Sequence, residues 1–403
     1  MKTNTGQNLA GGDPAIPLAV GPAGIDVGAI ERELNGFWEE LGKEDQQGGV
    51  IRSCVLNLLV YVDDRRLERV ADEALIDVTL RHPSRVLLMT GEAGAAQAAM
   101  AAHVISRCTL PTGNSKQVCC EQVMLTATGT QVNELPSAAA SLLLSDLPVY
   151  LWWCAAPAFD NRVFRRLSDL ADRIVIDLGR SHAVLDDLIR LGGIIKANSR
   201  RSSFSDLSWS RLTAWRKLLA GFYDVAEYRS LFGRLSSVRL VYAPPEAGRE
   251  QIAADALLLL GWLASRLGWQ LESAGRSALS VRSGGQTFAV LFEPSDRSDS
   301  KAGQLIGLSL ESAPGQIEAG PPPESACSAF HISQSQEGEQ LITDIRFGEE
   351  QRTAHICRSD PGDLSSAIGH ELETQGHDRI YEQAVIAGGE IADRLRQADS
   401  TSF

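Results

Sequence analysis

The most reactive side chains of this sequence are its cysteines, which could carry out thiol–disulfide chemistry. There are seven, and their odd number and irregular spacing do not predict a disulfide framework. No Cys-x-x-Cys and no His-x-x-x-His occurs, so the sequence predicts no metal site. If a redox switch exists, we expect it to use Cys154, or Cys327 with Cys357. The side chains of Cys119 and Cys120 diverge on a predicted strand, so we do not expect these two to act as the switch. The alternative, that all seven are structural or incidental, is favoured.

A second group of residues combines arginine with tryptophan over residues 206–220. The spacing of the apolar positions predicts one amphipathic helix here, capped by Asp206 or Ser208. The residues that share or flank its apolar face are Trp209, Arg211, Leu212, Trp215, Arg216 and Leu219. Aromatic and arginine side chains are enriched at interface hot spots, so Trp209, Arg211, Trp215 and Arg216 are candidates for partner contact. An interdomain helix with solvated arginines is the favoured alternative.

Arginine could also hold a phosphate group, which makes a sugar-phosphate enzyme the alternative function. The candidates for that role are Arg200, Arg201, Arg211 and Arg216. The turn at residues 91–94 is glycine-rich, but it lacks both the Gly-Lys-Ser/Thr of a P-loop and a Gly-x-Gly-x-x-Gly. No nucleophile–base set or cofactor loop is recognisable. The sequence therefore predicts no catalytic residue, no cofactor and no enzymatic activity.

The elements that would position these residues are organised around the apolar segment 143–157. Its continuous run of Val, Tyr, Leu and Trp predicts a strand of a parallel sheet that is covered on both faces. Neighbouring side chains of a strand face opposite ways, so we expect Trp152 or Trp153, but not both, to lie in the core. Packing is the favoured role of this segment. Partner contact is the alternative, with Asp146, Pro148, Trp152 and Trp153 as candidates.

Strands and helices alternate over residues 25–200 and predict a Rossmann-like α/β domain with a mostly parallel sheet. It opens with a strand–helix–strand unit over residues 52–89. Residues 201–403 predict a smaller α+β domain that begins with the helix 206–220 and contains an antiparallel sheet. Residues 1–24 are rich in Gly, Pro, Asn and Thr and predict a flexible N-terminal tail.

Composition limits the classes of partner. The 403 residues suffice for two domains, and 44% hydrophobic with 22% charged residues is typical of globular proteins. A net charge of −13 argues against nucleic-acid and anionic-membrane surfaces. No apolar run is long enough to cross a bilayer, and residues 1–17 lack a secretory apolar region. We therefore expect a cytoplasmic protein.

Five short motifs occur in one order along the chain. They are RHPSRV at 81–86, CEQ at 120–122, DLPVYLWW at 146–153, LADRIVID at 170–177 and DLSWSRLTAWR at 206–216. Together they resemble the glucose-6-phosphate dehydrogenase assembly protein OpcA family, clearly over about residues 26–223 and weakly beyond. The resemblance implies a non-enzymatic partner that promotes assembly of glucose-6-phosphate dehydrogenase or activates it allosterically, in the oxidative pentose phosphate pathway. Some members are associated with thioredoxin-linked redox control, but the C-terminal region here has no closely spaced cysteine pair.

Three hypotheses remain open at this point. The leading one is an activator that binds the dehydrogenase and shifts its population by contacts made only with the active state. The second is a sugar-phosphate enzyme, and the third is a redox sensor without a fixed partner. They predict, respectively, co-purification with the dehydrogenase, turnover by the isolated chain, and a thiol-dependent conformational change.

Overall fold

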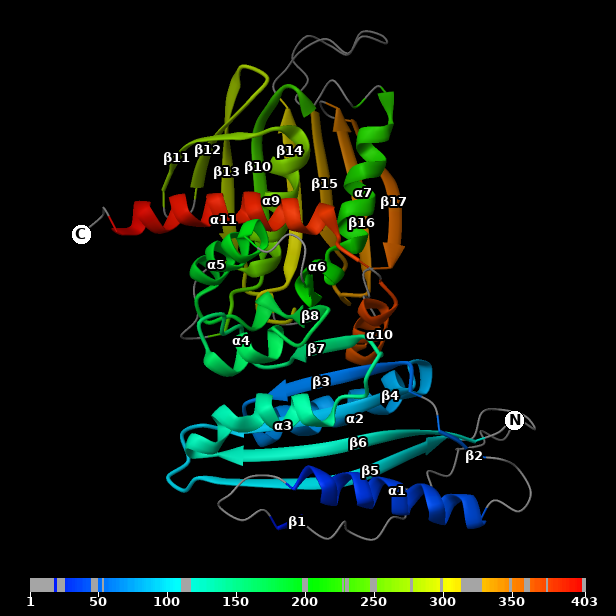
Figure 1. Ribbon diagram of the computed structural model, residues 1–403. Coiled ribbons are helices and arrows are strands. Elements are labelled where there is room, and N and C mark those ends of the chain that lie inside the picture. Colours follow the sequence, from blue (N-terminus) through cyan, green and yellow to red (C-terminus); the bar gives the residue numbers. More distant parts are fainter. Residues whose placement is uncertain are drawn as a thin grey trace, which may run out of the picture. The chain divides into compact units, whose positions relative to one another are not determined.

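The structure is a computed structural model with two β-sheets and helices packed on them (Figure 1). By its contacts the chain divides into two compact units, residues 1–152 and 153–403, and each is described by itself. The structure describes residues 18–19, 26–44, 50–52, 54–109, 117–197, 202–226, 228, 232–246, 252–275, 278–297, 300–312, 328–347, 350–358, 363–374 and 376–400. Within these residues no helix is both long and apolar enough to cross a membrane.

The first unit is built on a mostly parallel sheet. Its strands are β1 (Leu18–Ala19), β2 (Val50–Arg52), β3 (Leu56–Val62), β4 (Ser84–Glu92), β5 (Ala99–Thr109), β6 (Gln117–Thr128) and β7 (Val149–Trp153). They lie in the order β1-β5-β6-β4-β3-β7, with β2 beside β6. Strands β3, β4 and β6 pair in parallel, whereas β5 pairs antiparallel with β6 and with β1. The mostly parallel character is confirmed, while the Rossmann-like detail stays a prediction.

The helices of this unit are α1 (Val27–Glu44), α2 (Arg65–Arg81) and α3 (Leu135–Leu142), with the 3-10 helix η1 (Gly129–Glu134). Helix α2 connects the parallel strands β3 and β4, so the predicted βαβ unit is confirmed. Asp64 caps α2 by accepting a hydrogen bond of 2.7 Å from the Leu67 amide. The buried side of α2, which includes Ala71, Leu75 and Val78, packs on β3 and β4.

A buried ion pair joins two of the motifs that carry the family resemblance. The Arg85 guanidinium on β4 donates from Nε to the Glu121 carboxylate on β6 at 2.7 Å. Glu121 also accepts a hydrogen bond of 2.8 Å from the Trp38 indole, and Arg85 donates to Glu31 at 2.8 Å. Glu121 is fully buried, so this charge depends on its partners. The two motifs thus stabilise the first unit.

The second unit contains a mostly antiparallel sheet of eight strands, as predicted. In the order β11-β12-β13-β10-β14-β15-β16-β17, only the β10–β13 pair is parallel among the described strands. The strands are β10 (Leu235–Tyr242), β11 (Gln270–Ala274), β12 (Ala278–Ser283), β13 (Gln286–Pro294), β14 (Leu305–Ser312), β15 (Ser328–Gln334), β16 (Gln340–Phe347) and β17 (Glu350–Arg358). The second unit also contains two shorter strands, β8 (Arg173–Ile176) and β9 (Ser203–Asp206), which pair in parallel with each other and do not belong to the eight-stranded sheet.

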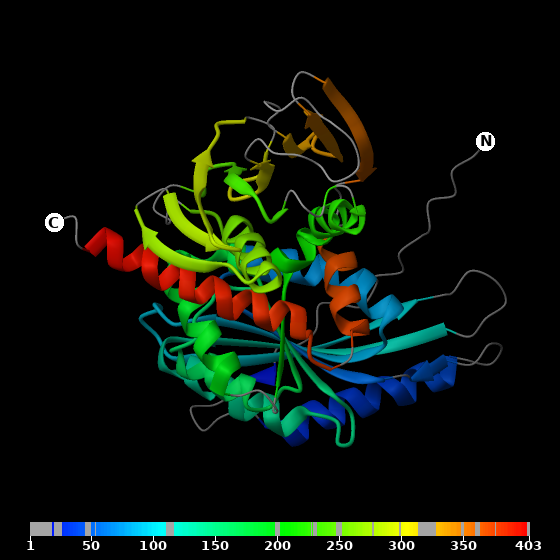
Figure 2. The ribbon, with the colours of Figure 1, turned by 90° about the horizontal axis from the view of Figure 1, so that it is seen from above.

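The described helices of the second unit pack on one another as well as on these strands. They are α4 (Arg162–Ser168), η2 (Leu178–Arg180), α5 (Val184–Ala197), α6 (Leu207–Arg211), α7 (Thr213–Asp224), α9 (Ala254–Leu267), α10 (Leu364–Glu373) and α11 (Arg379–Ser400). The long C-terminal helix α11 packs against both α5 and α9, and Figure 2 shows it crossing them. Residues 153–197 belong by contact to the second unit because α5 packs on α11. The contact boundary therefore falls inside β7 and not near residue 200, and the domain boundary at 200 stays a prediction.

One other expectation about local structure needs correction. The helix expected over 206–220 is two helices, α6 and α7, which meet at Leu212. The break is stabilised because the Arg216 guanidinium donates to the carbonyls of Leu212 and Trp209, at 3.4 and 3.3 Å. Of the expected tail, only residues 18 and 19 are described, as strand β1.

The tryptophan pair of β7 also differs from expectation. Trp152 is 1% exposed and Trp153 is 2% exposed, so the prediction that only one of them is buried is wrong. Alternation does turn neighbouring side chains to opposite faces, but both faces of β7 are covered. The Trp153 indole donates to the Ala156 carbonyl at 2.8 Å and packs edge-on against Phe164 at 5.0 Å.

We predict that Trp152→Ala and Trp153→Ala each lower the free energy of unfolding by about 3–5 kcal/mol, because both create a cavity in a packed interior. Urea unfolding followed by far-ultraviolet circular dichroism measures this. Tyr150→Ala, at a half-buried position of the same strand, is the control and should cost less. A near-native stability for either tryptophan variant would contradict the burial of that side chain.

A second stability prediction concerns the crossing of α9 and α11. A Cβ atom at Gly261 would lie 2.3 Å from the Ala384 carbonyl oxygen and 2.7 Å from the Gly388 amide nitrogen. Gly261→Ala should therefore destabilise the protein by about 1–3 kcal/mol or more, because it separates the two helices. Gly193→Ala on α5, where nothing lies within 4 Å, should instead stabilise it by about 0.5–1 kcal/mol. Thermal unfolding of the two variants should move in opposite directions, and a shared direction would refute the close crossing.

Candidate functional site

The candidate site of the second unit begins where β8 and β9 end. The two strands run in parallel with Ile176 opposite Asp206, so Asp177 and Asp206 leave the sheet at the same edge. This edge of a parallel sheet is where sites commonly form. Asp206 caps α6, since its Oδ1 accepts hydrogen bonds from the amides of Ser208 at 2.8 Å and Leu178 at 3.2 Å.

The Arg211 guanidinium at the end of α6 holds this edge together. It donates two hydrogen bonds to the Asp177 carboxylate, at 2.8 and 3.3 Å, and a third to the Ser208 hydroxyl at 2.7 Å. A second carboxylate, Asp255 in the first turn of α9, lies 3.7 Å from the same guanidinium. We call Asp177, Asp206, Ser208, Arg211 and Asp255 the acid–arginine cluster.

The three carboxylates differ in proton affinity because Arg211 lies among them, and Arg180 lies 3.9 Å from Asp177 alone. Burial alone would raise the pKa of Asp177, but the Arg211 guanidinium outweighs it and holds that pKa below its ordinary value. Burial, together with the charge of Asp177, raises the pKa of Asp206 to about 8. Burial raises the pKa of Asp255 to about 6, although Arg211 opposes the change. At neutral pH the cluster therefore keeps a proton on Asp206.

Residues from the C-terminal helices pack beside this cluster. The Trp209 indole donates to the Asp378 carboxylate at 3.0 Å and lies 5.7 Å from the ring of Tyr381. The Arg216 guanidinium lies 3.4 Å above the Trp209 ring, a cation–π contact. Burial lowers the pKa of Arg216 to about 10. On the same side, the Ser210 hydroxyl donates to Glu371.

These contacts show how residues 206–220 pack within the second unit. Trp209, Leu212, Trp215 and Leu219 are all buried, so the apolar face packs inside the second unit. Arg211 and Arg216 are half-buried and bonded within the unit, and neither is simply solvated. Arg200 and Arg201, the other phosphate candidates, lie outside the described residues. Direct partner contact by Trp209, Arg211, Trp215 or Arg216 stays a prediction.

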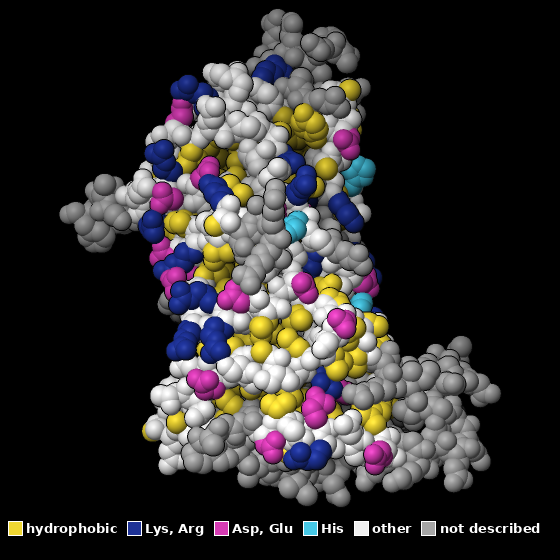
Figure 3. Space-filling model, viewed as in Figure 1, with side chains coloured by type: hydrophobic (Ala, Val, Ile, Leu, Met, Phe, Trp, Pro, Cys, Tyr) yellow, Lys and Arg dark blue, Asp and Glu magenta, His cyan; other side chains and the backbone are white. Residues whose placement is uncertain are grey.

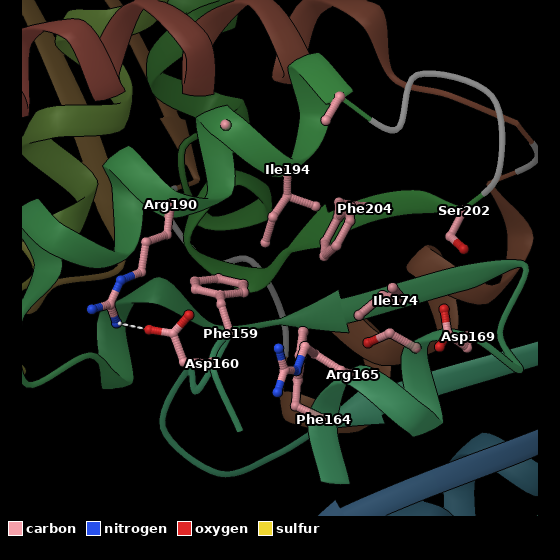
Figure 4. A pocket seen from close by; sticks show the side chains of 13 residues that line it. Phe159, Asp160, Phe164, Arg165, Asp169, Ile174, Arg190, Ile194, Ser202 and Phe204 are labelled. Carbon is pink, nitrogen blue, oxygen red and sulfur yellow. Dashed lines mark ion pairs between the residues drawn. The ribbon is translucent and has the colours of Figure 1, made fainter. Parts of the chain in front are cut away.

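A hollow of about 530 Å³ lies between α4, α5, β8 and β9, and Figure 4 shows it from close by. Its floor is apolar and includes Phe159, Phe164, Ile174 and Phe204, all buried. Phe159 and Phe164 meet edge to face at 5.4 Å. Gly193 on α5 lines the hollow and has nothing within 4 Å of the place a Cβ would take. We call this feature the aromatic hollow.

The rim of the aromatic hollow is charged. Arg190 from α5 pairs with Asp160 at 3.0 Å, the dashed contact of Figure 4, and Arg165 from α4 stands on the other side. Helix α4 carries Arg162, Arg165 and Arg166, and Figure 3 shows Lys and Arg side chains gathered over that helix. The rim also holds the carboxylates Asp160 and Asp169, so the hollow combines an apolar floor with charges of both signs.

The predicted contact residues of the first unit lie at the entry to β7. Asp146 and Pro148 are exposed. Asp146 has φ of 63°, the left-handed conformation that Asp tolerates in turns. The Pro148 carbonyl accepts a hydrogen bond of 2.8 Å from the Asn57 amide. These two residues are accessible, whereas Trp152 and Trp153 are not, and partner contact by any of the four stays a prediction.

The cysteines are placed differently from one another. Cys154 is buried, Cys357 is half-buried, and Cys327 lies outside the described residues. Burial raises the pKa of the Cys357 thiol, although Lys217 opposes the change. Cys119 is disulfide-bonded while Cys120 is free, so the adjacent pair is not bonded to itself. The sequence-based reasoning missed the disulfide of Cys119.

Several residues of the site were not singled out from the sequence. Asp177 and Asp206 each follow a short strand, and the rule that such ends form sites would have found them. For Asp255, the only sequence signal was its position in the first turn of a predicted helix. The C-terminal partners of these residues are more than 150 residues away in the sequence, and no local pattern pointed to them. They are Glu371, Asp378 and Tyr381. No group of His, Cys, Asp or Glu that could hold a metal ion occurs in the described part of the chain.

The fold and the site define a two-sheet α/β protein whose arginine and carboxylate cluster stabilises the structure beside open surface hollows. The chain belongs to the OpcA family. Residues 76–191 match the family described as glucose-6-phosphate dehydrogenase subunit N-terminal domain, and residues 202–385 match the corresponding C-terminal domain. These two matches meet close to the boundary expected near residue 200.

Three curated relatives carry the name putative OxPP cycle protein OpcA. The chain is 33% identical to the one from Nostoc punctiforme over 50% of its own length and 41% of the relative. It is 26% identical to the one from Synechocystis over 91% of its length and 74% of the relative. The protein of Synechococcus elongatus is 30% identical, over 74% of this chain and 65% of that one. The chain thus matches less than half of the first relative and about two thirds or more of the others.

Two solved structures share a coarse likeness. An oxidoreductase domain protein from Kribbella flavida has a TM-score of 0.44 at 10% identity, over 87% of this chain and 98% of that one. An NAD-binding oxidoreductase from Klebsiella pneumoniae has a TM-score of 0.43 at 8% identity, with the same coverage. A likeness this distant carries no argument about activity.

The raised pKa of Asp206 gives a pH prediction. In the folded protein the Asp206 carboxyl stays protonated up to about pH 8, whereas in the unfolded chain it loses its proton near pH 4. The stabilisation that comes from this raised pKa therefore falls as the pH rises through that window. The side chain that Asp206→Asn introduces does not titrate, so this variant lacks that pH dependence. The stability of the native protein relative to this variant should fall between pH 5 and pH 8, by at most about 1.4 kcal/mol per pH unit.

Urea unfolding at pH 5, 6, 7 and 8 measures the difference between the two proteins. Asp255 is present in both, so its own titration largely cancels. Asp296→Asn, at an exposed position, is the matched control. A difference that stays flat or rises across the window would show that Asp206 is ionised in the fold.

Proposed function

We propose that this protein binds glucose-6-phosphate dehydrogenase and promotes its active assembly, without a reaction of its own. The observation that carries the proposal is that both halves of the chain match domains described as parts of a glucose-6-phosphate dehydrogenase subunit. The name of the curated relatives supports a place in the oxidative pentose phosphate pathway. Thioredoxin-linked control through Cys154, Cys327 or Cys357 is a further part of the hypothesis.

The aromatic hollow is the docking surface that we assign to the dehydrogenase. Interface hot spots are buried aromatic pockets and arginines at the centre of a contact, and this hollow offers both. Its floor would take one apolar side chain of the dehydrogenase, and Arg165 would pair with a neighbouring carboxylate. An exposed hollow of about 530 Å³ is large enough for such an anchor.

Activation would follow from linkage. If the dehydrogenase offers this anchor only in its active assembly, binding shifts its population toward that state. A coupling of about 1–3 kcal/mol, typical of allosteric proteins, changes an apparent affinity for substrate by about 5–150-fold. We therefore expect the apparent affinity for glucose 6-phosphate to change more than the turnover number.

The decisive experiment mixes the purified chain with the dehydrogenase of the same host. Analytical ultracentrifugation should show a species larger than either protein, and the kinetics should show a lower KM for glucose 6-phosphate. Two independent species at micromolar concentration would sink the proposal. Turnover of glucose 6-phosphate by the isolated chain would favour the alternative, a sugar-phosphate enzyme.

The docking surface is tested by filling it. Gly193→Phe places a ring in the aromatic hollow at a position with no neighbour within 4 Å, so the fold should remain intact. We expect the affinity for the dehydrogenase to fall about tenfold or more. Gly36→Phe on α1, another open helical glycine, is the matched control and should bind as the native protein does. Equal binding by the two variants would remove the aromatic hollow from the interface.

A further inference from the structure

A second hollow of the second unit has a lining of a different kind. It lies between the first turns of α7, the end of β17 and α10, with a volume of about 590 Å³. Helix α7 packs against β17, and Figure 1 shows the two side by side. The charged, titratable and thiol residues of its lining are Arg211, Lys217, His355, Cys357, Arg358 and His370. We call this feature the basic hollow.

Among the described residues that line the basic hollow there is no carboxylate. Arg211 is already bound to Asp177 and Asp255, but Lys217 and Arg358 are exposed. Among the described residues, no Asp or Glu oxygen lies within 4.0 Å of the charged nitrogens of Lys217 or Arg358. Two cations are thus available for a bound group, with two histidines beside them.

This local charge runs against the composition of the chain. The whole protein has a net charge of −13, yet the described lining of this one concave surface holds Lys217 and Arg358, together with Arg211, whose acidic partners lie outside the lining. Like charges around one hollow repel, and a bound anion would replace that repulsion with attraction. The first turn of α7 adds to this field, because Thr213 and Ala214 line the hollow and a helix N-terminus carries partial positive charge.

We propose that the basic hollow binds a phosphorylated small molecule, a phosphate monoester of the size of a sugar phosphate or mononucleotide. A guanidinium and an ammonium together suit a phosphate dianion, the first through paired hydrogen bonds and the second as a point charge. The hydroxyls of Ser210 and Thr213 line the same hollow, and Ala214, Leu218 and Ala367 supply an apolar wall for the rest of the molecule. The volume lies within the range of small-molecule sites.

Cys357 provides a reporter inside the hollow. Its thiol is half-buried, and the positive charge of Lys217 acts to lower the pKa of this thiol. A phosphate group bound to Lys217 would shield the thiol and weaken the attraction that favours its thiolate, and both effects slow alkylation. Cys54 in the first unit is also half-buried and is likewise not disulfide-bonded, so it serves as the internal control.

The binding test uses the full chain and calorimetry with inorganic phosphate, glucose 6-phosphate and AMP, at fixed ionic strength. Glucose and adenosine are the unphosphorylated counterparts. We expect saturable binding of at least one ester, and alkylation of Cys357 that slows with its concentration while that of Cys54 does not. Binding of none of the three, of inorganic phosphate alone, or of glucose or adenosine as tightly as the corresponding ester would overturn the proposal.

Two variants locate the site. Lys217→Gln with Arg358→Gln should weaken the ester about tenfold or more, because each change removes a charge-assisted hydrogen bond. Lys301→Gln with Arg394→Gln makes the same charge change at exposed positions outside the hollow and should bind within about twofold of the native protein. Equal losses in the two double variants would overturn the proposal, since they would reflect net charge alone.

Gly221→Leu blocks the hollow without changing charge. Gly221 lines it, and nothing lies within 4 Å of the place its Cβ would take. Loss of ester binding in this variant is the expected result, and Gly193→Leu in the aromatic hollow should bind the ester normally. Native binding by Gly221→Leu would place the ester elsewhere. None of these measurements requires the dehydrogenase, so their failure would leave the proposed function untouched.

Discussion

One half-buried guanidinium, that of Arg211, holds the charged edge of the second unit together. Three carboxylates, Asp177, Asp206 and Asp255, approach it, and one cation can neutralise only one of them fully. Asp177 takes the paired hydrogen bonds, and Asp206 keeps a proton instead. The cluster thereby joins the ends of β8 and β9 to α6 and α9. Removing Arg211 would leave the Asp177 carboxylate, whose side chain is 13% exposed, without its main cation.

The C-terminal helices complete this arrangement. Asp378, at the start of α11, accepts from the indole of Trp209, and the body of α11 crosses α9 at Gly261. The exposed pair between Lys196 and Glu390 adds little, since surface ion pairs contribute about 0–1 kcal/mol. Close packing of α5 on α11, where a Cβ at Gly389 would lie 3.1 Å from the Leu188 carbonyl oxygen, is therefore what attaches residues 153–197 to the second unit. The same physics explains the family motifs of the first unit, where Arg85 and Glu121 form a buried pair.

The sequence allowed the main elements to be predicted because local periodicity and turn chemistry determine them. The βαβ unit, the mostly antiparallel second sheet and the buried face of Trp209, Leu212, Trp215 and Leu219 all follow from such patterns. The prediction that only one of the two β7 tryptophans is buried was wrong, because alternation along a strand gives the face of the sheet and not what covers that face. The break at Leu212 and the acid–arginine cluster depend on contacts over long sequence separations, which no local pattern reports.

Arg211 also connects the fold to the surface, because it belongs to the acid–arginine cluster and lines the basic hollow. An anion in that hollow would approach a guanidinium that already serves Asp177 and Asp255. It would compete for the same positive charge and make every neighbouring carboxylate harder to ionise, so the proton on Asp206 would be held more tightly. The cluster that stabilises the second unit is thus electrostatically coupled to the basic hollow. A ligand bound there would act on the interior of the unit through charge alone, without any movement of the backbone.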